Sequence, residues 1–236
     1  MKRQIIIPLA LSFLCSCGNN NAGSNKESKQ EKKESKRNIV RQPLRLLGDF
    51  TQITSLGGID IVYTQGSYNC EIEGDSASIS HVKADVESGI LTLYFTSDNN
   101  PEMLCYENKQ SITAYISTPD LNCVALCSTG NFSTTNKWKQ DNIELGIIGT
   151  GSFNLDSIEC NTFKYEATGD GDATFKHIDS KGSIMFTCMS KSNVKADINT
   201  DLIVATTQSG KINLTGKAKK KDISATNRAL IKDNTK

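Results

Sequence analysis

Residues 143–155 read IELGIIGTGSFNL, and this pattern is the strongest indication of the fold. Apolar residues alternate with other residues before the small residue Gly151 and again after it, which is the period of a strand. The stretch therefore predicts a strand, a turn of small residues and a second strand.

The same unit recurs with a period of about 20 residues, which indicates a stack of supersecondary units. Five units align at the small turn residues Gly130, Gly151, Gly171, Ser192 and Gly210. We expect Gly, Ser, Asn and Asp in these turns because φ > 0 and local side-chain hydrogen bonds cost them little. A leucine-rich repeat would need a fixed leucine ladder and a buried Asn in every unit, and the units have neither.

Counting from each turn predicts the side chains that point inward. The positions eight, six and four residues before the turn, and two and four residues after it, carry mostly apolar side chains. The five columns are Asn122, Ile143, Phe163, Ile184, Leu202; Val124, Leu145, Tyr165, Phe186, Val204; Leu126, Ile147, Ala167, Cys188, Thr206; Phe132, Phe153, Ala173, Val194, Ile212; and Thr134, Leu155, Phe175, Ala196, Leu214. Trp138 falls near Ile158, Ile178 and Ile198 in the repeat, so we expect it to close the core.

These columns predict an all-β, single-stranded β-helix (a right-handed β-solenoid) with coils of about 20 residues that pair about 4.8 Å apart. The domain spans residues 44–236, with repeats over about 112–228. The section before the repeats predicts strands at 50–53, 59–64, 70–72, 82–86 and 90–95, with turns at 65–67 and 87–89. We expect this section to pair as hairpins over the N-terminal end, and residues 112–117 to enter the first coil. Helix should be nearly absent.

The first residues are typical of an exported lipoprotein. A basic start and an apolar run over residues 5–14 predict a signal peptide over residues 1–16, too short to span a bilayer. The following Leu-Cys-Ser-Cys resembles a bacterial lipobox, which implies that Cys17 is lipidated; an ordinary signal peptide is the alternative. Residues 17–43 then form the lipidated Cys and a disordered tether, because they contain almost nothing apolar. The net charge of +1 over the whole chain gives no basic face for nucleic acid.

Several motifs together resemble a known family. The motifs are residues 57–60, 62–66, 73–75, 89–93 and 112–121, followed by turns at 128–132, 149–153, 168–173 and 209–212. Their order resembles the "putative auto-transporter adhesin, head GIN domain" family of bacterial lipoproteins and secreted proteins, which repeats Ser-Gly-Ser-Gly-Asp-Ile. Residues 190–194 depart from that motif by lacking Gly. The resemblance covers residues 45–228 and implies a β-helical fold in the cell envelope; it brings no catalytic residues.

The β-helix architecture also occurs in polysaccharide lyases and hydrolases, whose sites need clustered carboxylates, often with Ca²⁺ or a basic residue. Asp170 and Asp172 share one turn, but the equivalent positions hold Asn131, Ser152, Asn193 and Lys211. Glu144 beside Lys164 reads as a surface ion pair. We predict no catalytic residue, no cofactor and no metal site.

The histidines and cysteines give no further site. We expect His81 and His177, the only histidines, to be surface residues. No repeat cysteine falls above another, so only Cys70 and Cys105 have unconstrained partners for a disulfide.

The sequence thus predicts a lipid-anchored, non-catalytic adhesin or binding module of the bacterial outer membrane. Its partners would be the membrane, through the N-terminal lipid, and a glycan or envelope protein, through a face of Ser, Thr, Asn and Lys. The alternatives are a polysaccharide-processing β-helix enzyme and a structural or assembly partner in the envelope.

Overall fold

A computed structural model describes residues 38–97, 100–105, 111–226 and 230–236. Cys17 and the predicted signal peptide lie outside the described residues. Strands dominate, and the one helix in these ranges is the single turn α1 (Ser76–Ile79). None of the described residues belongs to a helix long and apolar enough to cross a bilayer. The prediction of an all-β solenoid with almost no helix is confirmed.

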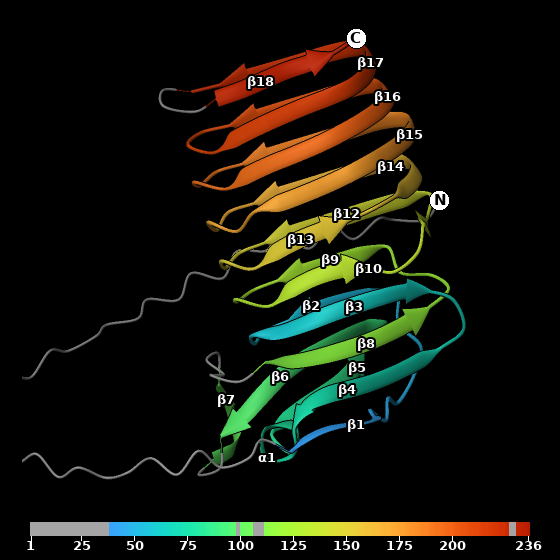
Figure 1. Ribbon diagram of the computed structural model, residues 1–236, viewed down its shortest axis with the longest axis vertical. Helices are drawn as coiled ribbons and strands as arrows, with labels where there is room; N and C mark the ends of the chain where they lie inside the picture. The colour runs from blue at the N-terminus through green and yellow to red at the C-terminus, as the bar shows by residue number, and fades with distance from the viewer. Residues whose placement is uncertain (1–37, 98–99, 106–110, 227–229) are drawn as a thin grey trace, which may run out of the picture. The chain divides into compact units, whose positions relative to one another are not determined.

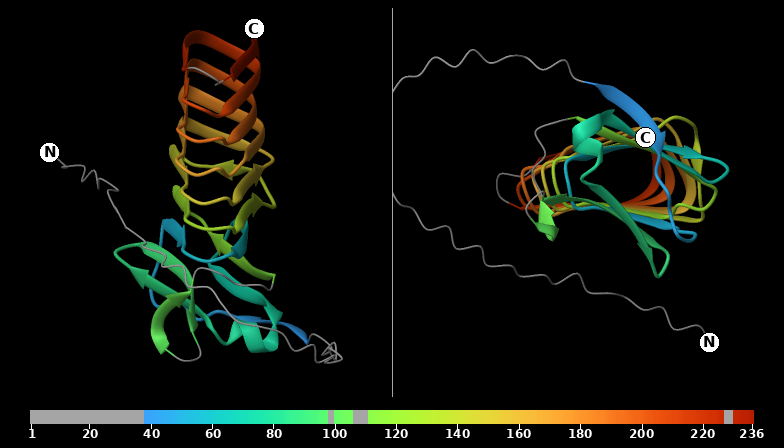
Figure 2. Two further views of the ribbon diagram at one scale, coloured as in Figure 1. Left: turned by 90° about the vertical axis from the view of Figure 1, so that its left-hand side faces the viewer. Right: turned by 90° about the horizontal axis from the view of Figure 1, so that it is seen from below.

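The strands stack as flattened coils with two faces that pair in parallel (Figures 1 and 2). The first face consists of β6 (Ile90–Ser97), β2 (Gln52–Ser55), β9 (Cys123–Leu126), β12 (Asn142–Ile147) and the later halves of β14 (Ile158–Ala167), β15 (Ala173–Cys188), β16 (Asn193–Thr207) and β17 (Lys211–Ala225). The second face consists of β8 (Ile112–Thr118), β3 (Ile59–Gln65), β10 (Asn131–Thr134), β13 (Ser152–Leu155), the earlier halves of β15 to β17, and β18 (Leu230–Thr235).

Two edges join the faces. The small-residue turns form the turn edge. The opposite edge, here called the corner edge, comprises residues 135–142, 156–162, 176–183, 197–202 and 215–220 and includes β11 (Trp138–Lys139). Side chains paired across neighbouring coils are about 20 residues apart in the middle of the stack and 18 apart at its C-terminal end.

The N-terminal section contributes a complete coil to the stack. Strands β2 and β3 pair in parallel with β9 and β10 on one side and with β6 and β8 on the other. Ile61 thereby joins the inward column of Phe132. The expectation that residues 112–117 enter the first repeat coil is wrong, because the β2–β3 coil lies between β8 and β10.

Antiparallel pairs cover the N-terminal end, as predicted, but the strands predicted at 50–53 and 59–64 pair in parallel and not as hairpins. Strand β4 (Asn69–Asp75) pairs with β8 and with β1 (Ile39–Pro43), and β6 pairs with β5 (Val82–Glu87) and β7 (Asn100–Cys105). The predicted hairpin turn after Glu87 is present, with φ of 52° at Ser88 and 79° at Gly89. Strand β1 begins inside the segment predicted as tether, so ordered structure starts earlier than the boundary at residue 44.

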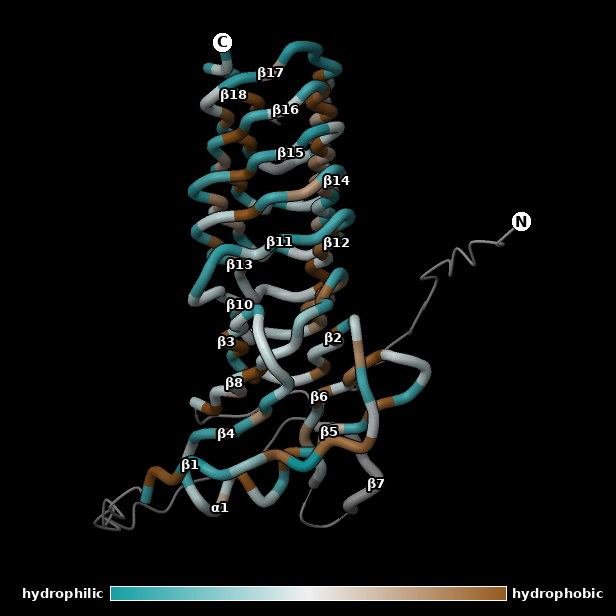
Figure 3. Tube along the Cα trace, turned by 90° about the vertical axis from the view of Figure 1, so that its right-hand side faces the viewer, coloured by the Kyte–Doolittle hydropathy of each residue, from teal (hydrophilic) through white to brown (hydrophobic). Residues whose placement is uncertain are grey.

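Aromatic rings fill the inside of the coils, and Figure 3 shows apolar residues recurring at the same places in successive coils. Tyr165 and Phe186 are fully buried in adjacent coils, with ring centroids 6.3 Å apart. Trp138 is also fully buried, pairs with Ile158 and donates from Nε1 to the carbonyl of Leu121 at 2.9 Å. The predicted core role of Trp138 is confirmed.

The predicted register fails in the last repeat before its turn. Leu202, Val204 and Thr206 were expected inside, but the buried residues are Ile203, Ala205 and Thr207. The turn that follows is one residue shorter than the turn below it, so counting back from Gly210 shifts the face by one. The Thr207 hydroxyl closes this shorter turn by accepting from the Gly210 N–H at 3.0 Å.

A second, smaller departure is at the first repeat. Asn122 is exposed, and its neighbour Leu121 is buried in its place.

The glycines of the turn edge have a different role from the one expected. None of Gly130, Gly151 and Gly171 has φ > 0. A Cβ on Gly151 would instead lie less than 3.0 Å from the carbonyl oxygen of Gly130 in the coil below. These turns therefore require glycine because successive backbones stack too closely for a side chain.

Two charged side chains cover the C-terminal end of the core. Lys221 continues the inward column of Phe163, Ile184 and Ile203, and Asp233 continues that of Leu214. The two side chains form an ion pair across the last coil.

Candidate functional site

The two aspartates of the third turn hold the next coil in place. Asp170 Oδ1 accepts from the Lys191 N–H at 3.1 Å. Asp172 Oδ1 accepts from the Asn193 N–H at 2.8 Å and from Asn193 Nδ2 at 2.9 Å. Both carboxylates thus satisfy backbone groups of the coil above, which is a structural role.

The two histidines lie in different parts of the fold. His81 follows α1 in the N-terminal section, whereas His177 lies on β15 at the corner edge. His177 Nδ1 is 2.9 Å from Asp197 Oδ2, and Thr215 donates to Asp197 Oδ1 at 3.0 Å. Hydrogen bonding from His177 lowers the pKa of Asp197 despite some burial. This exposed network links three coils.

The predicted ion pair between Glu144 and Lys164 is present on the first face. Lys164 Nζ lies 2.6 Å from Glu144 Oε1 and 3.5 Å from Glu166 Oε2, and all three side chains are exposed. Exposed pairs of this kind contribute about 0–1 kcal/mol each. The pair is therefore better explained as a surface feature than as an acid–base site.

The cysteines with described side chains are all free thiols: Cys70, Cys123, Cys127, Cys160 and Cys188. This agrees with the absence of stacked cysteine pairs in the repeat. The side chain of Cys105 lies outside the described residues, so its predicted freedom to pair is not tested. Burial raises the pKa of Cys70 to about 12 and those of Cys123 and Cys160 to about 11. Such thiols are poor nucleophiles at neutral pH.

No group of three or more potential metal ligands gathers among the described residues. A shallow polar depression of about 360 Å³ opens at the corner edge, lined by Lys139, Gln140, Asp141, Glu159, Cys160, Asn161 and Lys181. Most of its polar groups already have partners. Asn161 Nδ2 donates to Asp141 Oδ1 at 3.1 Å, and Glu159 accepts from Lys137 and Lys139.

A row of uncommitted polar side chains runs along the second face. Its members are outward residues of successive strands, and none of them has a side-chain hydrogen bond or ion pair with the described residues. The row, called the free polar row below, consists of Ser133, Asn154, Thr174, Lys195, Asn213 and Lys232. Parallel pairing places neighbouring members about 4.8 Å apart.

In the column on each side of this row, side chains form hydrogen bonds or ion pairs with side chains of the adjacent coils. On the turn-edge side, Asn131 donates to Asp60 Oδ1 at 2.9 Å and accepts from Ser152 at 2.7 Å. On the corner side, Lys176 Nζ lies 2.6 Å from Asp156 Oδ1. The internal bonds of the flanking columns leave the free polar row as the line of donors and acceptors open to a ligand.

The sequence predicted a polar face but could not separate the free row from its neighbours. Asn154, Thr174 and Asn213 share their chemistry with Asn131, Ser152 and Thr215. Only the positions of the coils decide which side chains meet. One signal in the sequence could have identified the row: each member directly follows the first inward residue after a turn, as Asn154 follows Phe153.

The family described as "putative auto-transporter adhesin, head GIN domain" matches residues 49–176. No curated protein matches the chain.

Several crystal structures share the fold. A putative adhesin from Bacteroides fragilis NCTC 9343 has 18% identity and a TM-score of 0.63, with 83% of this chain and 96% of that chain covered. A putative lipid binding protein from Parabacteroides distasonis ATCC 8503 has 15% identity and a TM-score of 0.55, with 83% and 97% covered. A putative adhesin from the same strain has 14% identity and a TM-score of 0.54, with 85% and 98% covered.

Proposed function

Because the chain belongs to the "putative auto-transporter adhesin, head GIN domain" family, we propose that it is a lipid-anchored adhesin of the bacterial cell envelope that binds glycans without catalysis. The family of putative adhesins and the putative adhesins that share the fold support a surface-binding role. The ligand would lie along the second face, parallel to the solenoid axis.

The free polar row carries this proposal. Its amides, hydroxyls and ammonium groups offer donors and acceptors at regular spacing, and a polyhydroxylated polymer presents the matching groups repeatedly. The coils hold these side chains on paired strands, so little backbone ordering is needed when a ligand binds. Each hydrogen bond is weak, and affinity would come from several made together.

A glycan array with the full chain in nonionic detergent tests this function. The double variant Asn154→Ala/Asn213→Ala should lower affinity for a bound glycan about tenfold, because two neutral hydrogen bonds of about 0.5–1.5 kcal/mol are lost. Thr187→Ala, which removes a first-face hydroxyl without a hydrogen-bond partner among the described residues, is the control and should bind normally.

Four results would contradict the proposal. Failure of every glycan to bind would contradict it. An equal loss of glycan affinity in the Thr187→Ala control would also contradict it. New reducing ends or unsaturated products from the bound glycan would favour the alternative of a polysaccharide-processing enzyme. Capture of one envelope protein at fixed stoichiometry, without glycan binding, would favour an assembly partner.

The anchor is the other part of the proposal, and it rests on the lipobox-like sequence that ends at Cys17. Buried acyl chains contribute about 0.8 kcal/mol per CH₂, so several chains hold a protein to a membrane where one does not. Cys17→Ser should move the protein from the membrane fraction to the soluble fraction, whereas Cys15→Ser should leave it in the membrane. Retention of the Cys17→Ser variant in the membrane would rule out this anchor.

A further inference from the structure

The last complete coil of the solenoid is strongly basic, in contrast to the coils below it. Strand β17 contains five lysines and one aspartate. Strand β16 contains one lysine and two aspartates over the same length, and β14 contains one lysine and two glutamates. Positive charge is therefore concentrated at the C-terminal end of the stack.

Three of the five β17 lysines have no hydrogen bond or ion pair from their side chains to the described residues. Lys219 is paired with Asp201 at 2.6 Å and Lys221 with Asp233 at 3.0 Å. Lys211, Lys217 and Lys220 are exposed and unpaired. Together with Lys232 of β18, these three residues are called the basic coil below.

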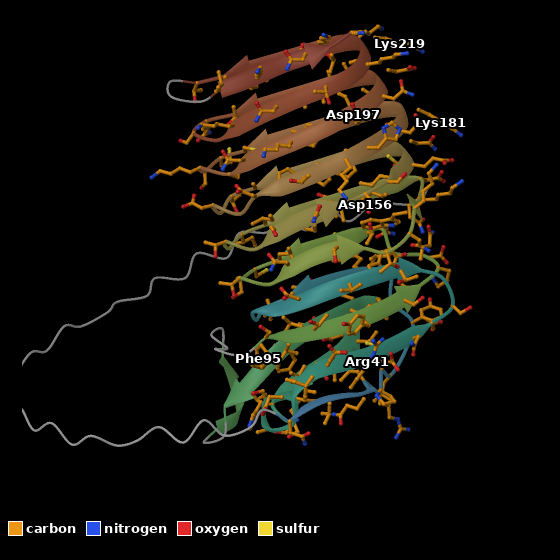
Figure 4. All side chains as sticks on the ribbon, viewed as in Figure 1. Arg41, Phe95, Asp156, Lys181, Asp197 and Lys219 are labelled. Atoms are coloured by element: carbon orange, nitrogen blue, oxygen red, sulfur yellow. The ribbon has the colours of Figure 1, made fainter. Side chains whose placement is uncertain are left out.

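The basic coil surrounds one end of the solenoid. Lys211 stacks above Asn193 at the turn edge, whereas Lys217 and Lys220 stack above Asn199 and Leu202 at the corner edge. Lys232 is above Asn213 at the end of the free polar row. Figure 4 shows Lys219 at the end of the corner edge, with Lys181 lower on the same edge. The basic coil therefore continues the proposed binding row around the tip.

We propose that the basic coil binds an acidic polysaccharide, one whose sugars carry carboxylate, sulfate or phosphate groups. This inference rests on the proposed function and names the ligand class. Lysine ammonium groups are mobile point charges without the fixed fork of arginine, so they suit flexible anionic polymers better than a single rigid oxyanion. The groups are spread over four columns, which an extended chain can contact one after another.

A membrane surface is a less suitable partner for this end. The predicted lipid anchor precedes β1 in the chain, and β1 and β17 lie at opposite ends of the stack of coils (Figure 1). Lysines on several sides of one coil also cannot all meet one flat surface of lipid headgroups. A flexible polymer can bend around the tip and contact lysines on several sides, and it need not lie near the N-terminal end of the stack.

Binding of the full chain in nonionic detergent to four probes tests the inference: heparin, polygalacturonate, neutral dextran, and vesicles of phosphatidylglycerol with phosphatidylcholine. Heparin and polygalacturonate should bind more tightly than dextran, and added salt should weaken their binding by screening. The variant Lys217→Gln/Lys220→Gln should reduce affinity for both about fivefold to tenfold, because each exposed ionic contact contributes modestly.

The matched control replaces two other exposed lysines that form no ion pair within the described part of the chain, Lys83→Gln/Lys191→Gln, and should bind heparin like the wild type. An equal loss of heparin affinity in this control would show that binding depends only on the net charge of the protein, and it would overturn the inference. Tighter binding to the vesicles than to either acidic polysaccharide would also overturn it, in favour of a membrane contact.

The inference and the proposed function can fail separately. If neutral glycans bind through Asn154 and Asn213 while acidic polysaccharides gain nothing from Lys217 and Lys220, only the inference fails. If no polysaccharide binds at all, both fail.

Discussion

Lys221 Nζ lies 3.0 Å from Asp233 Oδ2 and 2.9 Å from the carbonyl oxygen of Thr235, at the end of two columns whose four preceding members are all apolar. An apolar last coil would leave an open core and an exposed strand edge on which a second solenoid could stack. Charges that point inward at such an edge oppose this association.

The double variant Lys221→Met/Asp233→Leu should therefore keep or increase stability but promote end-to-end association. Replacing a partly buried ion pair by apolar residues of similar size is often neutral or stabilising. The measurement is sedimentation velocity over a range of concentrations, alongside urea unfolding. A variant that remains monomeric at high concentration would show that the pair does not protect the end.

The same pair predicts a pH dependence. Burial acts to raise the pKa of Asp233, but hydrogen bonds from Thr235 and Lys221 outweigh it and lower that pKa below its usual range. Because the folded-state pKa is lowered, the contribution is present above the unfolded-state value of about 4 and disappears as pH falls through the folded-state value. Asp233→Asn should cost about 1 kcal/mol or less at pH 7 and nothing at low pH. An equal cost at both pH values would contradict this linkage.

Replacement by alanine should change the stability of the protein in opposite directions at Gly146 and Gly151. A Cβ on Gly151 meets the backbone of the coil below, whereas a Cβ on Gly146 meets no atom within 4 Å. Gly151→Ala should destabilise the protein by about 2–4 kcal/mol, since stacked backbones must separate. Gly146→Ala should be neutral or stabilise it by up to about 1 kcal/mol through the unfolded state. Urea unfolding of both variants decides, and equal stability would disprove close stacking at the turn edge.

The close backbone stacking at Gly151 illustrates which features of the fold can be predicted from the sequence and which cannot. Periodicity alone placed Phe163, Phe186 and Trp138 in the core, because alternation in a strand assigns every side chain to a face. It could not foresee that Gly151 is needed for backbone stacking, since that requires knowing which carbonyl lies below.

The errors occurred where the period changes or where segments far apart in sequence meet. Ile203 replaced Leu202 in the core because one turn lost a residue, and both residues are apolar enough to fit either face. The coil of β2 and β3 was missed because its partner β9 lies about 70 residues later in the chain. The free polar row was not predicted for a related reason: Asn154 and Asn131 differ only in what the adjacent coil offers them.

The thiols of the half-buried Cys123 and the buried Cys160 should react slowly in the folded protein. With the pKa of Cys123 and of Cys160 raised to about 11, roughly one part in a thousand is thiolate at pH 8, compared with about a quarter for a free cysteine of pKa near 8.5. Iodoacetamide labelling followed by peptide mass spectrometry should show both sites largely unmodified until urea is added. Rapid labelling of Cys160 in the folded protein would indicate an accessible, activated thiol that this fold does not provide.

Two buried tyrosines should differ in their need for the hydroxyl group. The Tyr63 hydroxyl donates to the carbonyl of Thr118 at 2.9 Å, whereas the Tyr165 hydroxyl is buried without a hydrogen-bond partner among the described residues. Burial raises the phenol pKa of both, so both stay protonated at any physiological pH.

Tyr63→Phe should therefore cost about 1 kcal/mol or less, because it removes one of the two hydrogen bonds that the Thr118 carbonyl accepts, while the Gly66 N–H still donates to it at 3.3 Å. Tyr165→Phe should be neutral or stabilise the fold by up to about 1 kcal/mol, because it removes a desolvated hydroxyl that gains nothing. Both changes keep the ring and its packing against Phe132 or Phe153, so each variant is the control for the other. Urea unfolding at pH 7 measures the difference. A greater loss for Tyr165→Phe than for Tyr63→Phe would mean that the Tyr165 hydroxyl has a partner inside the solenoid.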